Sequence, residues 1–100
     1  MQPVELMKCS LPFSLKPKDR PLIISRSTFP YAGQFGGHWL GDNSATWVDL
    51  KASITGVLNF NFFGIPLVGA DICGFNGNTQ PELCLRWTQV KLSLVVFKRN

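Results

Sequence analysis

Short apolar runs alternate with helical patterns along this chain after residue 20. Residues 21–26 and residues 65–70 are apolar runs bounded by turn-forming residues, a pattern typical of buried parallel strands. Residues 30–43 form a glycine-containing, loop-rich stretch around a second short strand. The pattern therefore predicts three strands, with polar residues emerging at their ends.

A first helix is expected between the second and third of these strands. Apolar residues recur at helical intervals over residues 47–58, and Thr46 and Asp49 have the spacing of a capping box at the helix start. Gly64 and Pro66 are expected to stop the helix before the third strand begins.

A second helix is expected after a turn over residues 74–78. Thr79 and Glu82 have capping-box spacing, and Pro81 fits the first helical turn. Its apolar stripe consists of Leu83, Trp87 and Val90. The order strand, strand, helix, strand, helix predicts an α/β fold with part of a parallel sheet.

Length and composition limit what the chain can be. It has 100 residues and 11.1 kDa, enough for one small domain, whereas a barrel of eight strand–helix units needs about 250 residues. Hydrophobic residues make up 45% and charged residues 16%, which argues against disorder. No apolar run reaches the roughly 18 residues of a membrane span, and Glu5 and Lys8 interrupt any signal peptide at the start.

The net charge of +4 is scattered rather than clustered, and most aromatic residues fall in apolar segments. A nucleic-acid partner is therefore not expected, because such proteins gather basic residues with exposed aromatics.

The cysteines Cys9, Cys73 and Cys84 leave two interpretations open. Cys73 and Cys84 are near enough in sequence to close a short disulfide loop, and two buried free thiols are the alternative. Three cysteines and one distant histidine lack the paired spacing of a zinc site, so no metal is predicted. Cys9 receives no role.

Polar side chains stand where the three strands should end. Arg26, Asp42 and Asp71 would converge on one mouth in a barrel, because parallel strands place their carboxyl ends at one edge. With Trp39 beside them, such groups suit recognition of a polyol, the ring stacking on a sugar and the charges binding its hydroxyls. The alternative is that Asp42 only caps the following helical region and Arg26 is a surface charge.

Two other polar residues have simpler interpretations. Asp49 follows Trp47 in a W-x-D sequence that precedes a nucleophile in some glycosidases, but its position in a helical period favours a capping role. His38 is a possible base or metal ligand, and its place beside Trp39 favours an orienting hydrogen-bond partner.

Three longer segments resemble glycoside hydrolase family 31, nearest to its animal lysosomal acid α-glucosidase and maltase-glucoamylase branch. They are residues 20–29 (RPLIISRSTF), residues 37–43 (GHWLGDN) and residues 63–75 (FGIPLVGADICGF), and the likeness continues to residue 89. The resemblance implies that residues 20–90 are a fragment of a (β/α)8 TIM barrel, incomplete on its own, and that the enzyme is an O-glycosyl hydrolase.

The resemblance also implies roles for particular residues. Asp42 matches the general acid/base of a retaining mechanism that releases terminal α-linked glucose from malto-oligosaccharides or glycogen without a cofactor. Arg26, Trp39, Asp71 and Phe75 match positions that line the glucose subsite. Cys73 and Cys84 match a family disulfide, and the family's members suggest a lysosomal or extracellular location.

The sequence departs from the family pattern at both ends. The family's nucleophile lies in W-x-D-M-N-E, and residues 1–41 hold no match to it. Residues 1–19 and residues 91–100 also diverge, the latter replacing an F-x-R-N-H continuation. We therefore expect the 100 residues alone to be inactive and to fold poorly, with a non-catalytic interaction or glycan-binding remnant as the alternative.

Overall fold

A computed structural model of the chain describes the backbone of residues 22–93 and the side chains of residues 22–90. Its elements in chain order are β1 (Ile24–Ser25), the 3-10 helix η1 (Ala32–Gln34), β2 (Gly37–Trp39), α2 (Trp47–Phe62), β3 (Val68–Gly69) and α3 (Pro81–Ser93). The predicted order of three strands and two helices is confirmed.

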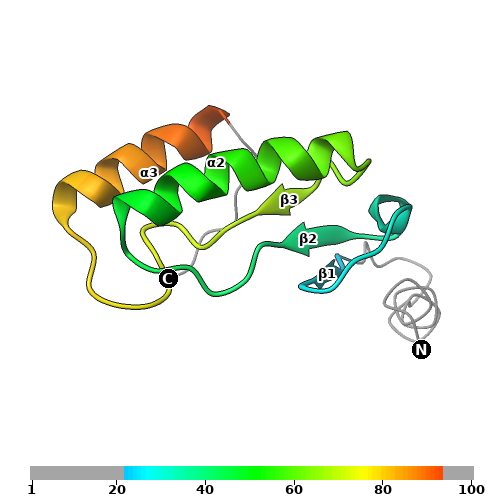
Figure 1. Ribbon diagram of the computed structural model, residues 1–100, viewed down its shortest axis with the longest axis horizontal. Helices are drawn as coiled ribbons and strands as arrows, with labels where there is room; N and C mark the ends of the chain where they lie inside the picture. Colours follow the sequence, from blue (N-terminus) through cyan, green and yellow to red (C-terminus); the bar gives the residue numbers. More distant parts are fainter. Residues whose placement is uncertain (1–21, 94–100) are drawn as a thin grey trace.

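The three strands form one parallel sheet in the order β1-β2-β3. Ile24 pairs with Gly37, and His38 pairs with Val68. Both helices lie on the same side of this sheet, with α2 running above β2 and β3 and α3 beside it (Figure 1). The β2–α2–β3 segment is thus a strand–helix–strand crossover, the repeating unit of a parallel barrel.

The strands are shorter than the sequence predicts. Of the apolar run 65–70, only Val68–Gly69 has strand pairing, and within the described residues of the run 21–26 only Ile24–Ser25 does. Within residues 22–93, β1 and β3 each have a neighbouring strand on one side only. β1 and β3 can extend only as far as β2 forms ladder hydrogen bonds with them, and β2 is itself three residues long.

The start of α2 is fixed by the predicted capping pair. The Thr46 hydroxyl accepts the Asp49 N–H at 3.2 Å, and the Asp49 carboxylate accepts the N–H of Ser44. Asp49 is therefore a capping residue, as expected, and its negative charge lies at the positive end of the helix. The chain leaves α2 through Gly64, whose φ is +80°.

The start of α3 differs from the prediction by one residue. The Gln80 carbonyl accepts the Cys84 N–H at 3.0 Å, which makes Gln80 the N-cap residue directly before the first helical residue, Pro81. The Thr79 hydroxyl instead lies 3.4 Å from the Gln80 carbonyl. The expected Thr79–Glu82 capping box is therefore wrong, because Pro81 occupies the first helical position and shifts the start past Thr79.

Two apolar clusters hold the elements together. Leu50, Ile72, Leu83 and Trp87 pack between α2, α3 and the segment that follows β3. Ala32 and Ile65 form a second cluster beneath η1. Several large apolar side chains remain exposed within residues 22–90, among them Tyr31, Phe62 and Phe63. Exposed apolar surface of this kind is what a fragment of a larger barrel presents where neighbouring strands and helices would pack.

A disulfide joins Cys73 to Cys84 with a Cα–Cα distance of 4.6 Å. It connects the loop after β3 to the first turn of α3 and confirms the pairing that the family resemblance implied. Across the part of the chain that the structure describes, neither helix has the length and apolar character that crossing a membrane requires.

Candidate functional site

The polar residues singled out in the sequence lie at one edge of the sheet. Arg26 directly follows β1, Asp42 lies three residues beyond the end of β2, and Asp71 lies two residues beyond the end of β3. Since the three strands are parallel, their carboxyl ends share this edge. Barrels of this kind place ligands at the same edge.

Arg26 and Trp39 are brought together there. The guanidinium carbon of Arg26 lies 5.7 Å from the centre of the Trp39 ring, within the range of a cation–π contact. Gly41 has a φ of +93°, and a Cβ at this position would lie 2.9 Å from the Arg26 Nε. Gly41 therefore allows the backbone next to Asp42 to approach the guanidinium.

Trp39 occupies the face of the sheet that α2 does not cover. The preceding residue, His38, stacks on Phe60 of α2, so the His38 side chain faces the helices. Successive side chains of a strand point to opposite faces, which directs Trp39 away from α2. In a closed barrel that face is the interior.

The Asp42 side chain is exposed, and within residues 22–90 its carboxylate takes part in no hydrogen bond or ion pair. It lines a hollow of about 300 Å³ with Asn43, Asp49 and residues of α2, whereas Arg26 lines a different cavity. The structure therefore places Asp42 at the expected edge, in a hollow that it shares with residues of α2 and not with Arg26.

Asn43 ties the loop that carries Asp42 to the loop after β3. Its side-chain amide donates to the Asp71 carbonyl at 2.9 Å, and its side-chain oxygen accepts the Phe75 N–H at 3.0 Å. Its backbone carbonyl accepts the N–H groups of Phe75 and Asn76 at 3.0 and 2.9 Å. The sequence alone predicted no role for Asn43. The only signal was a short amide directly after Asp42 in a strand-to-helix loop, where such side chains bond to backbone.

The loop after β3 presents Asp71 and Phe75 differently. Asp71 is 9% exposed, and Phe75 is 38% exposed. Cys73 and Gly74 between them have φ values of 71° and 94°, and the disulfide to Cys84 holds this turn against α3. Asp71 is thus buried at the base of the loop, while Phe75 stands at its outer end.

His38 lines the cavity that Arg26 also lines, which is separate from the hollow beside Asp42. Its Nδ1 lies 2.9 Å from the Thr28 hydroxyl, and its ring stacks on Phe60 with centres 3.8 Å apart. Burial lowers the pKa of His38, because the charged imidazolium loses its hydration. His38 therefore has a hydrogen-bond partner in Thr28, and the orienting role that the sequence favoured stays a prediction.

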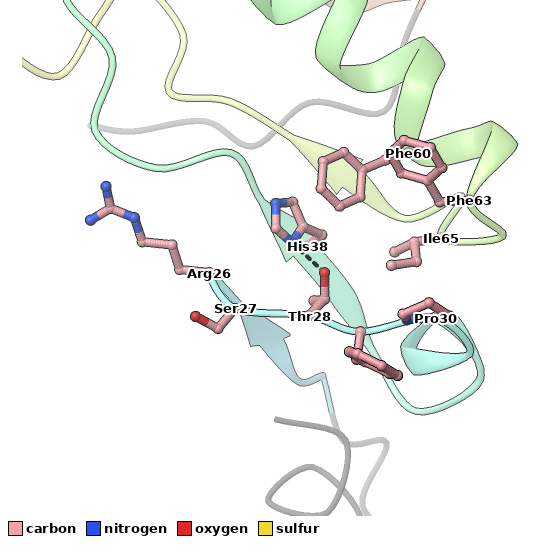
Figure 2. A pocket seen from close by; sticks show the side chains of 9 residues that line it. Arg26, Ser27, Thr28, Pro30, His38, Phe60, Phe63 and Ile65 are labelled. Atoms are coloured by element: carbon pink, nitrogen blue, oxygen red, sulfur yellow. Dashed lines mark hydrogen bonds between the residues drawn. The ribbon is translucent and has the colours of Figure 1, made fainter. Parts of the chain in front are cut away.

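Figure 2 shows that cavity, which measures about 690 Å³ and is lined mainly by apolar side chains, including Phe60, Phe63 and Ile65. The Arg26 guanidinium is directed away from those rings, toward the edge of the sheet. Among the described residues, no group of three His, Cys, Asp or Glu side chains is placed to hold a metal ion.

Comparison with known proteins decides the family. The model of the glycosyl hydrolases family 31 TIM-barrel domain matches residues 6–98. The chain belongs to this family. The probable maltase-glucoamylase 2 of Homo sapiens is 60% identical over 72 residues, which cover 72% of this chain and 3% of that protein. The lysosomal alpha-glucosidase of Rattus norvegicus is 58% identical over 81 residues, which cover 81% of this chain and 8% of that protein.

A solved structure gives the same result for the fold. The crystal structure of a glucosidase II alpha subunit, in a form described as alpha3-Glc2-bound, matches with a TM-score of 0.76 and 40% identity, over 83% of this chain and 9% of that one. The family 31 chain described here therefore spans less than a tenth of these relatives, and its three parallel strands and two helices are a fragment of the family's TIM barrel.

Proposed function

We propose that this chain carries the acid/base part of a retaining α-glucosidase site, with Asp42 as the general acid/base. The observation that carries the proposal is the arrangement at the carboxyl edge of the sheet. Arg26, Asp42 and Asp71 follow three adjacent parallel strands there, and the Arg26 guanidinium lies close both to the Trp39 ring and to Gly41, the residue before Asp42. The match to family 31 relatives supports the reaction class.

In the first step, the protonated Asp42 gives its proton to the glycosidic oxygen as the bond from that oxygen to the glucose C1 breaks. A second carboxylate, which in the family lies in the W-x-D-M-N-E sequence that residues 1–41 lack, attacks C1 and forms a glycosyl ester. In the second step, Asp42 takes a proton from water, whose oxygen displaces the ester at C1. A carboxyl group that serves both steps must be free to exchange its proton. Asp42 is exposed, and within the described residues its carboxylate makes no hydrogen bond or ion pair.

The substrate class is a terminal α-linked glucose, as in malto-oligosaccharides or glycogen. Trp39 offers an apolar ring to stack on the sugar, with the Arg26 guanidinium beside it as a donor to hydroxyl groups. Asp71 and Phe75 complete the glucose subsite from the loop after β3. The shared tie through Asn43 supports grouping these two residues with Asp42.

The 100 residues alone are proposed to be inactive. Residues 1–41 contain no W-x-D-M-N-E sequence, so the carboxylate that forms the glycosyl ester has no counterpart there. Loss of one member of a cooperating catalytic set removes several powers of ten in rate. Purified chain should accordingly release no glucose from maltose above the background of an Asp42→Asn chain.

The proposal is tested in a complete barrel. In a chimaeric enzyme that we call the rat graft, residues 22–90 of this chain replace the matching segment of the Rattus norvegicus lysosomal alpha-glucosidase. The rat graft should hydrolyse maltose, and Asp42→Asn should lower its kcat/KM by about a thousandfold or more. Glu82→Gln, which also neutralises one exposed carboxylate, is the matched control and should leave the rate unchanged.

Two results would contradict the proposal. One is a folded rat graft that binds glucose but does not hydrolyse maltose, which favours the glycan-binding remnant. The other is an Asp42→Asn graft as active as the Glu82→Gln graft.

A further inference from the structure

We infer that Asn43 is a positioning residue that fixes where Asp42, Asp71 and Phe75 lie relative to one another. This inference rests on the proposed function, because it concerns how the acid/base of that site is held. It is carried by a set of hydrogen bonds in which one short side chain reaches a loop 28 to 32 residues away.

The side chain of Asn43 uses its donor and its acceptor in opposite directions along that loop. The amide nitrogen donates to the Asp71 carbonyl at 2.9 Å, and the amide oxygen accepts the Phe75 N–H at 3.0 Å. A carboxylate of the same shape has no donor for the Asp71 carbonyl, and an alanine satisfies neither group. The position therefore needs an amide of this length.

The backbone around Asn43 repeats the same connection. The Asn43 carbonyl accepts the Phe75 and Asn76 N–H groups, and the Asn76 carbonyl accepts the Ala45 N–H at 2.8 Å. Ser44 and Asn76 form a parallel bridge. The two loops are thus joined as a short extension of the sheet beyond the ends of β2 and β3. Asp42 directly precedes the first residue of this extension, Asn43.

Within residues 22–90, the Asp42 carboxylate makes no hydrogen bond or ion pair that would fix it. The placement of its backbone consequently depends on its neighbours, Gly41 on one side and Asn43 on the other. Loosening the Asn43 tie shifts the proton-carrying group relative to the substrate, and a displacement of about 1 Å can reduce a rate by roughly a hundredfold.

The test uses Asn43→Ala and Asn43→Asp in the rat graft, with Asn61→Ala as the matched control. Asn61 also donates its amide to a backbone carbonyl, that of Val57 at 2.8 Å, but does so at the far end of α2. Asn43→Asp has nearly the shape of the native side chain, so it decides the question even where the alanine variant does not fold.

Both Asn43 variants should lower kcat for maltose by about 10- to 100-fold with little change in KM. They should affect 4-nitrophenyl α-glucoside less, since its leaving group needs less help from a proton. Hydrogen exchange in a peptide spanning residues 73–77 should rise, because loss of the bond to the Asp71 carbonyl loosens the contact between the two loops that protects the Phe75 and Asn76 N–H groups. Asn61→Ala should change none of these quantities.

A kcat within about twofold of the unmodified graft would overturn the inference. So would equal losses on the two substrates, or unchanged exchange in residues 73–77. These outcomes are separate from failure of the proposed function, which is read from Asp42→Asn alone: a graft that loses activity with Asp42→Asn but not with either Asn43 variant refutes only the positioning role.

Discussion

The guanidinium of Arg26 lies 5.7 Å from the centre of the Trp39 ring and joins the carboxyl end of β1 to that of β2. The two residues are adjacent in space because Ser25 pairs with His38 in the sheet, and Arg26 and Trp39 are the residues that directly follow this pair. A planar cation held near an aromatic ring is pre-organised for binding, since less side-chain freedom is lost when a ligand arrives.

Arg26→Met in the rat graft should weaken substrate binding. Methionine retains much of the length and apolar contact of arginine but removes the charged donors, and a hydrogen bond to a charged group is worth about 1.5–3 kcal/mol. We therefore expect KM for maltose to rise by about 10- to 100-fold in steady-state kinetics. Arg86→Met, on the exposed face of α3, is the matched control, and equal KM values for the two variants would refute a substrate contact by Arg26.

Gly74 and Gly77 provide a matched pair of glycines in the loop after β3. Both have a positive φ, +94° and +80°, but a Cβ at Gly74 would overlap the backbone of Ala45, while a Cβ at Gly77 meets nothing within 4 Å. Gly77→Ala should cost only the backbone strain of about 1–2 kcal/mol. Gly74→Ala should also push the loop away from Ala45, which predicts faster hydrogen exchange over residues 71–76 in the rat graft. Equal exchange in the two variants would contradict this close approach.

The Cys73–Cys84 disulfide restrains the same loop from the other side. Closing a loop of this size is worth about 3 kcal/mol through the entropy of the open chain. Replacing both cysteines by serine in the rat graft should therefore increase exchange and protease cleavage over residues 71–80. Slower glucose release should accompany it, because Asp71 and Phe75 lose a fixed position. Unchanged cleavage in the serine variant would show that the disulfide does not hold the loop.

His38 predicts a pH dependence of local stability. Burial lowers its folded-state pKa below the ordinary value of 6.5, so the unfolded state binds a proton more readily than the folded state. The stability that the neutral ring contributes is complete above pH 6.5 and is lost as the pH falls below that value. Hydrogen exchange over β2 and α2 in the rat graft, corrected for intrinsic rates, should therefore increase on acidification.

His38→Phe retains an aromatic ring against Phe60 but cannot be protonated. The part of the acid-induced exchange that His38 causes should disappear in this variant, while the part due to carboxyl groups elsewhere remains. An identical increase in both proteins would mean that His38 stays equally easy to protonate when folded.

The helices could be predicted from the sequence because their signals are local. Thr46 and Asp49 are three residues apart, and the Asp49 N–H donates to the Thr46 hydroxyl as the capping rule expects. The Thr79–Glu82 pair shows the limit of the same rule. The rule placed the cap at Thr79, and with Pro81 at the first helical position the cap lies one residue later, at Gln80.

The site could be predicted only in part, since its geometry depends on residues distant in sequence. The edge on which Arg26, Asp42 and Asp71 lie follows from the strand order, which the hydrophobic pattern indicates. The contacts of Asn43 with Asp71 and Phe75 span 28 and 32 residues, and no periodicity records them.

The central claim is that Asp42 transfers the proton in both steps, and azide tests it most directly. Azide attacks the glycosyl ester without needing a base, so it replaces the water that a missing acid/base can no longer activate. In the Asp42→Ala rat graft with 4-nitrophenyl α-glucoside, we predict that azide restores turnover and that NMR identifies α-glucosyl azide as the product. A folded Asp42→Ala graft that releases only glucose, at a rate that azide does not change, would contradict the account.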